Sequence, residues 1–112
     1  MPKELIEQLK ADNFYVKSAL SGHRPVQWHH VFTFAGKSIQ EPWNIVPLTK
    51  DEHDAVTPHK PNYDREADEH VRWIALNRAS NLQLNSYSKV EDLIAIKWRL
   101  NLKYGKEKML SV

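Results

Sequence analysis

Three histidines and one asparagine in the first half of the chain are the residues best suited to chemistry. His29 and His30 are adjacent, Asn44 follows His30 by 14 positions, and His53 follows Asn44 by 9. A neutral imidazole can accept a proton from water near pH 7, and it is a common ligand of metal ions. Because adjacent residues of a β-strand point to opposite faces, a His pair on a strand can direct one ring to a metal ion and the other to water. The pattern predicts a small site that joins a general base to a divalent metal ion.

The composition limits which other sites the chain can build. The absence of cysteine excludes disulfides, thiolate nucleophiles and Cys-based zinc sites, so any metal ion must be bound by His, Asn, Asp or Glu. The net charge is +2, from 16 basic and 14 acidic residues, which is compatible with a nucleic-acid partner but does not by itself indicate one. A length of 112 residues with 41% hydrophobic residues fits a single domain spanning 1–112.

The N-terminal segment "MPKELIEQLK" is charged and amphipathic and lacks the apolar centre of a signal peptide. No run of 18 apolar residues occurs anywhere in the chain. We therefore expect a soluble, cytoplasmic protein without a membrane partner.

Two strands and a short helix must position the four residues. "VQWHHVFTF" is rich in aromatic and β-branched residues and predicts a strand over about 26–34. Gly36 opens a polar loop, and "WNIVPL" predicts a second, short strand, so the two strands form a hairpin with a long connection.

A capping box predicts where the helix after this hairpin begins. Thr49 and Glu52 have the T-x-x-E spacing in which both side chains bind open amides of a first helical turn. Pro58 ends the helix, which is expected over about 50–57 and carries His53 back toward the hairpin.

Helices are expected on both sides of this core. A short one covers about 2–10, and a longer one covers about 63–80 with Ala67, Val71, Ile74 and Ala75 on one stripe. A second capping box, Ser88 with Glu91, predicts a last helix over about 88–104 that stops at Gly105. The other face of the last helix is basic and is a candidate for binding nucleic acid, through Lys97, Arg99 and Lys103.

The segment from Gln27 to about Val56 resembles the HNH endonuclease family, the ββα-metal or His-Me finger group. The resemblance rests on the His29-His30 pair, Asn44 and His53 at this spacing and on the ββα order, and it covers about a quarter of the chain. It implies an α+β fold with a ββα-metal core at about 26–58 and additional packed helices at the N- and C-terminal sides.

The resemblance also implies roles for these residues. His29 and His53 would ligate a divalent metal ion (Mg²⁺, Mn²⁺, Zn²⁺ or Ni²⁺), His30 would be the general base that activates water, and Asn44 would hold the base-bearing backbone or ring in place. The first position is often Asp in the family, and His at this position favours zinc or other transition ions.

The third metal ligand is left open. Many family members carry another His four residues after the helical one, where this chain has Thr57. Asp54 and His59 are the candidates in its place, with Asn44 and water as further alternatives.

The function that follows from the resemblance is a metal-dependent endonuclease that hydrolyses DNA phosphodiester bonds. The DNA could be branched or single-stranded, and specificity could come from a homodimer or a protein partner. Small stand-alone proteins of this family suggest a phage or mobile element and the cytoplasm of a bacterial or phage-infected host. Two alternatives use the same scaffold without catalysis: a nucleic-acid-binding module and a zinc-stabilised interaction module.

Overall fold

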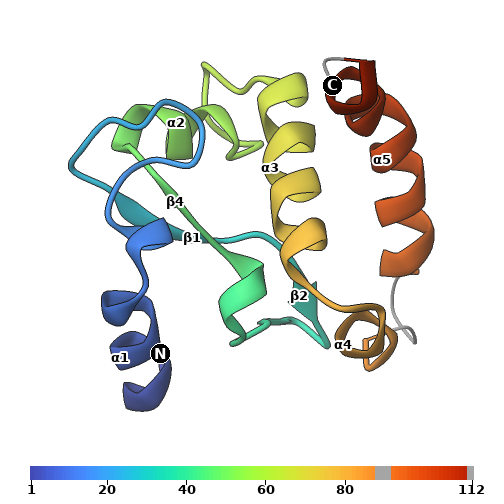
Figure 1. Cartoon of the computed structure of the whole chain (residues 1–112). Helices are drawn as coiled ribbons and strands as arrows, with labels where there is room; N and C mark the ends of the chain where they lie inside the picture. The colour runs from blue at the N-terminus through green and yellow to red at the C-terminus, as the bar shows by residue number, and fades with distance from the viewer. Residues whose placement is uncertain (88–91, 111–112) are drawn as a thin grey trace.

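A computed structural model of the chain describes residues 1–87 and 92–110. Within these residues, five α-helices and two small antiparallel two-stranded sheets form an α+β domain (Figure 1). None of the helices in this part of the chain is long and apolar enough to cross a membrane.

The predicted hairpin with a long connection is confirmed. β1 (Gln27–His30) pairs antiparallel with β4 (Ile45–Leu48), and the register places His29 opposite Val46 and His30 opposite Ile45. All four residues of β4 are buried, whereas β1 is exposed at Gln27 and partly buried over Trp28, His29 and His30.

The expected strand over 26–34 is divided in two. After His30 the chain leaves β4, and the side chain of Asn44 binds the Phe32 amide in place of a strand partner. The connection then forms its own small hairpin of β2 (Thr33–Phe34) and β3 (Lys37–Ser38), followed by the 3₁₀ helix η2 (Pro42–Asn44). Ala35 and Gly36 both have positive φ, 53° and 78°, as the tight turns that suit twisted hairpins require.

The predicted capping box at the start of α2 (Lys50–Ala55) is confirmed. Thr49 Oγ1 accepts from the Glu52 amide at 3.3 Å, and Glu52 Oε1 accepts from the Thr49 amide at 2.8 Å. Ser18 Oγ also donates to Glu52 Oε1 at 2.5 Å, which ties the preceding loop to the helix start. α2 ends two residues earlier than expected and contacts both β1 and β4.

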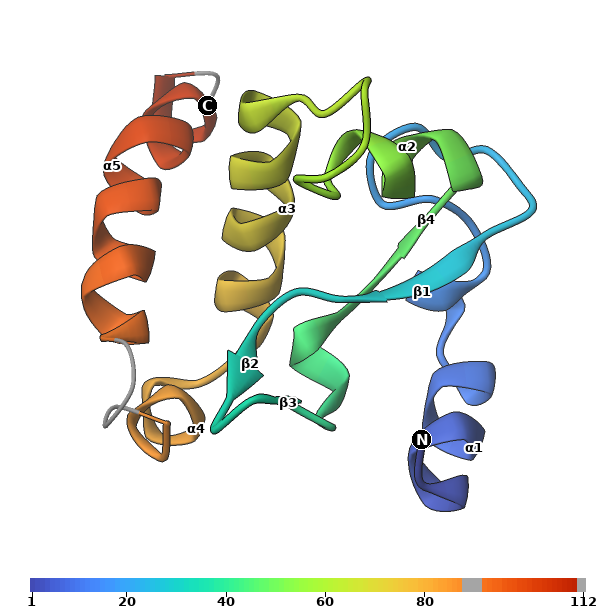
Figure 2. The same ribbon diagram turned by 180° about the vertical axis from the view of Figure 1, so that it is seen from behind.

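The two long helices expected after the hairpin are present, and they lie on one side of it. α3 (Arg65–Arg78) lies between the hairpin and α5 (Leu93–Leu110), and the two views agree on this order (Figures 1 and 2). Val71 and Ala75 of the predicted stripe are fully buried. The predicted capping box of Ser88 and Glu91 lies outside the described residues.

The predicted stop at Gly105 is wrong, because α5 continues to Leu110. A glycine inside a helix costs about 1 kcal/mol relative to alanine, which weakens the helix without ending it. The short helix α4 (Asn81–Asn85) was not expected, although Ser80 and Gln83 form a capping box that starts it.

The N-terminal helix is also confirmed, as α1 (Lys3–Ala11), and it lies on the side of the molecule opposite α5 (Figure 2). Its Leu5 and Leu9 form a second small core with Tyr15, from the 3₁₀ helix η1 (Asn13–Tyr15), and with Ile45 of β4. This cluster holds β4 from the side away from the long helices.

Candidate functional site

His29 and His53 face each other across β1 and α2. Their ring centroids are 4.9 Å apart and the ring planes are nearly perpendicular, at 84°. The capping box fixes where α2 begins, and His53 closes the first turn of this helix, which contacts the strand that carries His29. The fold thus brings together the two residues to which the family resemblance gives a metal-binding role.

His30 has a different environment from its neighbour, as expected for adjacent residues on a strand. Its Nε2 lies 3.1 Å from Oε1 of Gln40, which belongs to the connection between β3 and η2. An amide oxygen can only accept, so in this arrangement Nε2 carries the proton and Nδ1 has the free lone pair. A histidine in this tautomer can take a proton at Nδ1.

Asn44 is completely buried and joins three backbone groups of the connection that follows His30. Its Oδ1 accepts from the Phe32 amide at 2.8 Å, and its Nδ2 donates to the carbonyls of Phe32 and Ile39, both at 3.0 Å. Its own carbonyl accepts from the Val31 amide at 2.9 Å. Asn44 therefore fixes the backbone immediately after His30 and does not contact the His30 ring in any of these bonds.

Burial is the largest cause that lowers the pKa of His29 to about 4, followed by the nearby charge of His53 and smaller contributions of the same sign from His30 and Arg72. The carboxylate of Asp68 acts in the opposite direction. His29 is therefore neutral at neutral pH and keeps a lone pair for a ligand.

Asp68 and Arg72 of α3 reach the site without having been predicted. Asp68 is buried, accepts from the Tyr63 hydroxyl at 2.6 Å and pairs with Arg72 Nε at 3.5 Å. The guanidinium of Arg72 also lies 5.9 Å from the ring centroid of Phe32, two residues after His30. The sequence held one signal that could have pointed to them. Asp68 lies three positions before Val71, in phase with the apolar stripe, and Arg72 follows Asp68 at the i+4 spacing of helical ion pairs.

The two candidates for the third metal ligand lie apart from the histidine pair. Asp54 pairs with Lys50 at 3.6 Å along α2, and His59 is exposed in the turn beyond the helix. In residues 1–87 and 92–110, no group of three or more His, Cys, Asp or Glu side chains is arranged to hold a metal ion. Which group completes the coordination remains a prediction.

His29 and His53 offer two imidazoles, from different elements, that could ligate a metal ion. Their rings approach each other, and His29 is neutral at neutral pH. Paired imidazoles suit Zn²⁺, Ni²⁺ and other transition ions better than Mg²⁺, which prefers oxygen ligands.

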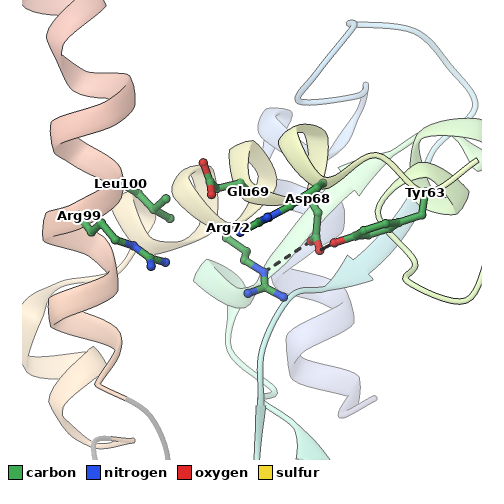
Figure 3. A pocket seen from close by; sticks show the side chains of 7 residues that line it. Tyr63, Asp68, Glu69, Arg72, Arg99 and Leu100 are labelled. Atoms are coloured by element: carbon green, nitrogen blue, oxygen red, sulfur yellow. Dashed lines mark hydrogen bonds and ion pairs between the residues drawn. The ribbon is translucent and has the colours of Figure 1, made fainter.

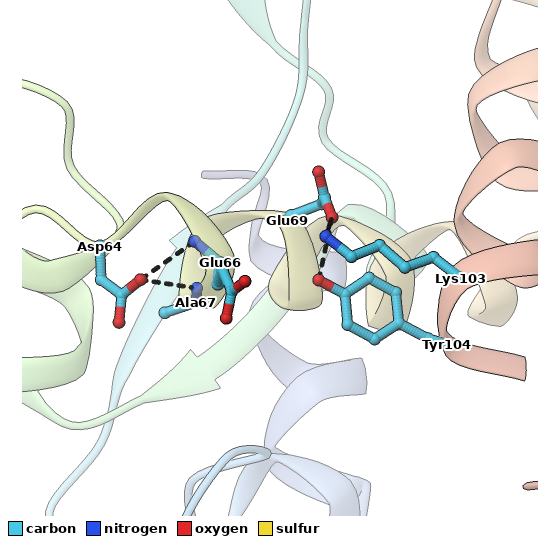
Figure 4. Close-up of polar contacts among 6 residues, drawn as sticks. All are labelled: Asp64, Glu66, Ala67, Glu69, Lys103 and Tyr104. Carbon is cyan, nitrogen blue, oxygen red and sulfur yellow. Dashed lines mark hydrogen bonds and ion pairs between the residues drawn. The ribbon is translucent and has the colours of Figure 1, made fainter. Parts of the chain in front are cut away.

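The three basic residues expected to bind nucleic acid differ in how they are engaged. Lys97 Nζ donates to the Ala79 carbonyl at 3.1 Å, which satisfies the C-terminal end of α3. Lys103 Nζ lies 2.5 Å from Glu69 Oε1, to which Tyr104 also donates, and this joins α5 to α3 (Figure 4). Arg99 makes no ion pair within the described part of the chain.

Comparison of the chain with protein-family models, with curated proteins and with solved structures gave no match.

Proposed function

We propose that the protein is a metal-dependent endonuclease that hydrolyses phosphodiester bonds of DNA. The observation that supports this most strongly is the division of the two adjacent histidines: His29 meets His53, while the His30 ring meets Gln40 through Nε2 and keeps Nδ1 for a proton. A hydrolase of this kind needs a base for water and, close by, separate ligands for a cation.

His30 would act as the general base. Its Nε2–H donates to Gln40, which leaves Nδ1 to remove a proton from the attacking water molecule. A positioned base of this kind typically contributes about 10²–10⁴-fold to the rate. Asn44 supports the base indirectly, because it fixes the backbone that follows His30 through bonds to Phe32 and Ile39.

His29 and His53 would hold the divalent ion. When bound there, such an ion supplies Lewis-acid stabilisation of the phosphate and of the leaving oxygen. The burial that keeps His29 neutral favours this role, since only a neutral imidazole can donate a lone pair. Substrate oxygens and water would complete the coordination.

Cleavage of a panel of DNA substrates tests the proposal. Supercoiled, linear, single-stranded and branched DNA are incubated with the protein in Mg²⁺, Mn²⁺, Zn²⁺, Ni²⁺ or EDTA. We expect cleavage of at least one substrate with at least one ion, and none in EDTA. Salt-dependent binding without cleavage in any ion would instead support the nucleic-acid-binding module. A sharp loss of thermal stability on chelation, with no DNA binding, would support the zinc-stabilised module.

A further inference from the structure

A polar hollow lies between α3 and α5. It has a volume of about 150 Å³ and is lined by Tyr63, Arg65, Asp68, Glu69, Arg72, Arg99 and Leu100 (Figure 3). The volume is well below the roughly 300–1,000 Å³ of pockets that enclose drug-sized molecules, so the hollow suits one small group rather than a whole base or cofactor.

Both carboxylates of the hollow are already neutralised by other residues. Asp68 accepts from Tyr63 and pairs with Arg72, and its side chain is only 9% exposed. Glu69 is bound by Lys103 and Tyr104, and the hydrogen bond from Lys103 holds the pKa of Glu69 below its usual value despite the opposing effect of burial (Figure 4). The acidic groups therefore leave little negative charge for a cation to bind.

Two arginines of the hollow form no ion pair. Among the described residues, neither Arg65 nor Arg99 has a carboxylate within 4.0 Å, although the charge of Arg99 contributes to the lowered pKa of Glu69. Arg72 contributes a third guanidinium, which pairs with Asp68, and in Figure 3 the side chain of Arg99 extends from α5 toward α3, the helix that carries Arg72. Convergent guanidinium groups with free N–H donors recognise phosphate oxygens.

The hollow also adjoins the segment that follows His30. Arg72 lines the hollow, and its guanidinium lies 5.9 Å from the ring centroid of Phe32, two residues after His30. A group bound between Arg72 and Arg99 would therefore lie next to the site that would hold the scissile phosphate.

We propose that Arg65, Arg72 and Arg99 form a binding site for a backbone phosphate of the nucleic acid, adjacent to the one that is cleaved. The site deepens the proposed function and rests on it. It differs from the basic face expected from the sequence. Lys97 and Lys103 bind the Ala79 carbonyl and the Glu69 carboxylate of the protein itself, and Arg65 and Arg72 come from another helix.

The test measures binding of the full-length protein to a labelled DNA duplex in EDTA, at several salt concentrations. The variants are Arg65→Gln, Arg99→Gln and the double variant, with Lys10→Gln on the distant α1 as the matched loss of one positive charge. Arg72 is left in place because its pairing with the buried Asp68 also supports the fold. A thermal melt of each variant checks folding.

The double variant should bind the duplex roughly tenfold more weakly at 0.1 M salt, and the slope of log Kd against log salt should fall by about 1 or more. Lys10→Gln should match the wild type. An unchanged slope in the folded double variant would refute the phosphate site, as would a wild type that does not bind DNA.

A titration with inorganic phosphate distinguishes a site for free phosphate from a site for the DNA backbone. It is carried out at constant ionic strength and followed by the NMR resonances of the arginine Nε–H groups. Tight binding of inorganic phosphate together with an unchanged duplex slope would mean a small-anion site and would overturn the assignment to the backbone. Weak binding of inorganic phosphate with an altered duplex slope supports it.

Cleavage assays run in parallel keep the two proposals distinguishable. If the wild-type protein binds DNA with a salt slope that depends on the two arginines but cuts no DNA, the phosphate site is supported and the nuclease proposal is refuted. If the wild-type protein cuts DNA but the double variant has an unchanged salt slope, the nuclease proposal is supported and the phosphate site is refuted.

Discussion

The imidazoles of His29 and His53 lie edge to face, with ring centroids 4.9 Å apart, although one belongs to a strand and the other to the helix that follows the hairpin. The same strand carries His30, whose ring instead meets Gln40. Two neighbouring residues of one type are thus held in different chemical environments by the alternation of a β-strand.

Removal of either ring of the pair should abolish tight binding of a transition metal ion. We expect His29→Gln and His53→Gln each to lower the affinity for Zn²⁺ or Ni²⁺ by at least about tenfold, since even the loss of a supporting partner has an effect of that size. His23→Gln, in an exposed loop, is the matched control and should bind as the wild type does. Isothermal titration calorimetry measures the affinities, and equal affinity in all four proteins would contradict the assignment.

Asn44→Ala should destabilise the protein strongly. It leaves the Phe32 amide and the Phe32 and Ile39 carbonyls without their partner in a fully buried position, and we expect a loss on the order of 2–4 kcal/mol. Asn77→Ala removes an exposed asparagine whose side chain bonds only within α3, and it should change stability by less than about 0.5 kcal/mol. Urea unfolding of both variants is the measurement, and a small effect of Asn44→Ala would mean that the connection is held by other contacts.

The pKa of His29 predicts a dependence of stability on pH. Because this pKa is about 4 in the folded protein and near 6.5 in the unfolded chain, the unfolded state binds more protons between these values. The free energy of unfolding should therefore rise from pH 4 to pH 6.5, with a contribution from His29 of roughly 1–3 kcal/mol after allowance for partial exposure. His29→Gln, measured by urea unfolding in EDTA, should show a shallower profile, whereas parallel profiles would show that His29 is not perturbed.

The start of α2 should matter for metal binding as well as for stability. Thr49→Ala removes one half of the capping box and should cost about 1 kcal/mol, and it should also weaken metal binding because His53 depends on where the helix begins. Ser80→Ala removes the equivalent residue at α4, away from the histidines, and should cost a similar amount without affecting the metal. If both variants bind the metal ion equally well, the cap does not position His53.

The sequence predicted the elements that local chemistry determines. The aromatic and β-branched run gave β1, the T-x-x-E spacing gave the start of α2, and the stripe containing Val71 and Ala75 gave α3. It did not predict where β1 ends, because that depends on a side chain 14 residues away: Asn44 takes the place of a strand partner at Phe32. The end of α5 was also missed, since glycine disfavours a helix without excluding it.

The candidate site, too, could be predicted only in part from the sequence. The pairing of His29 with His53 was predicted from the resemblance to the HNH family, but the contact of Gln40 with His30 and the charges of Asp68 and Arg72 near His29 arise only through tertiary packing. The engagement of Lys97 with the end of α3 could not be predicted either, because a basic residue on a helix face has the same sequence pattern whether it meets solvent or a carbonyl group.

The proposed role of His30 as the general base is tested most directly by removal of its imidazole. The measurement is the single-turnover rate of plasmid DNA cleavage with a divalent ion for the wild type, His30→Ala and the control His23→Ala, alongside DNA binding in EDTA. His30→Ala should lose at least about 10²-fold in rate while it keeps its DNA affinity and its metal affinity, and His23→Ala should cut as the wild type does. Cleavage by His30→Ala at the wild-type rate would contradict the assignment of His30 as the base.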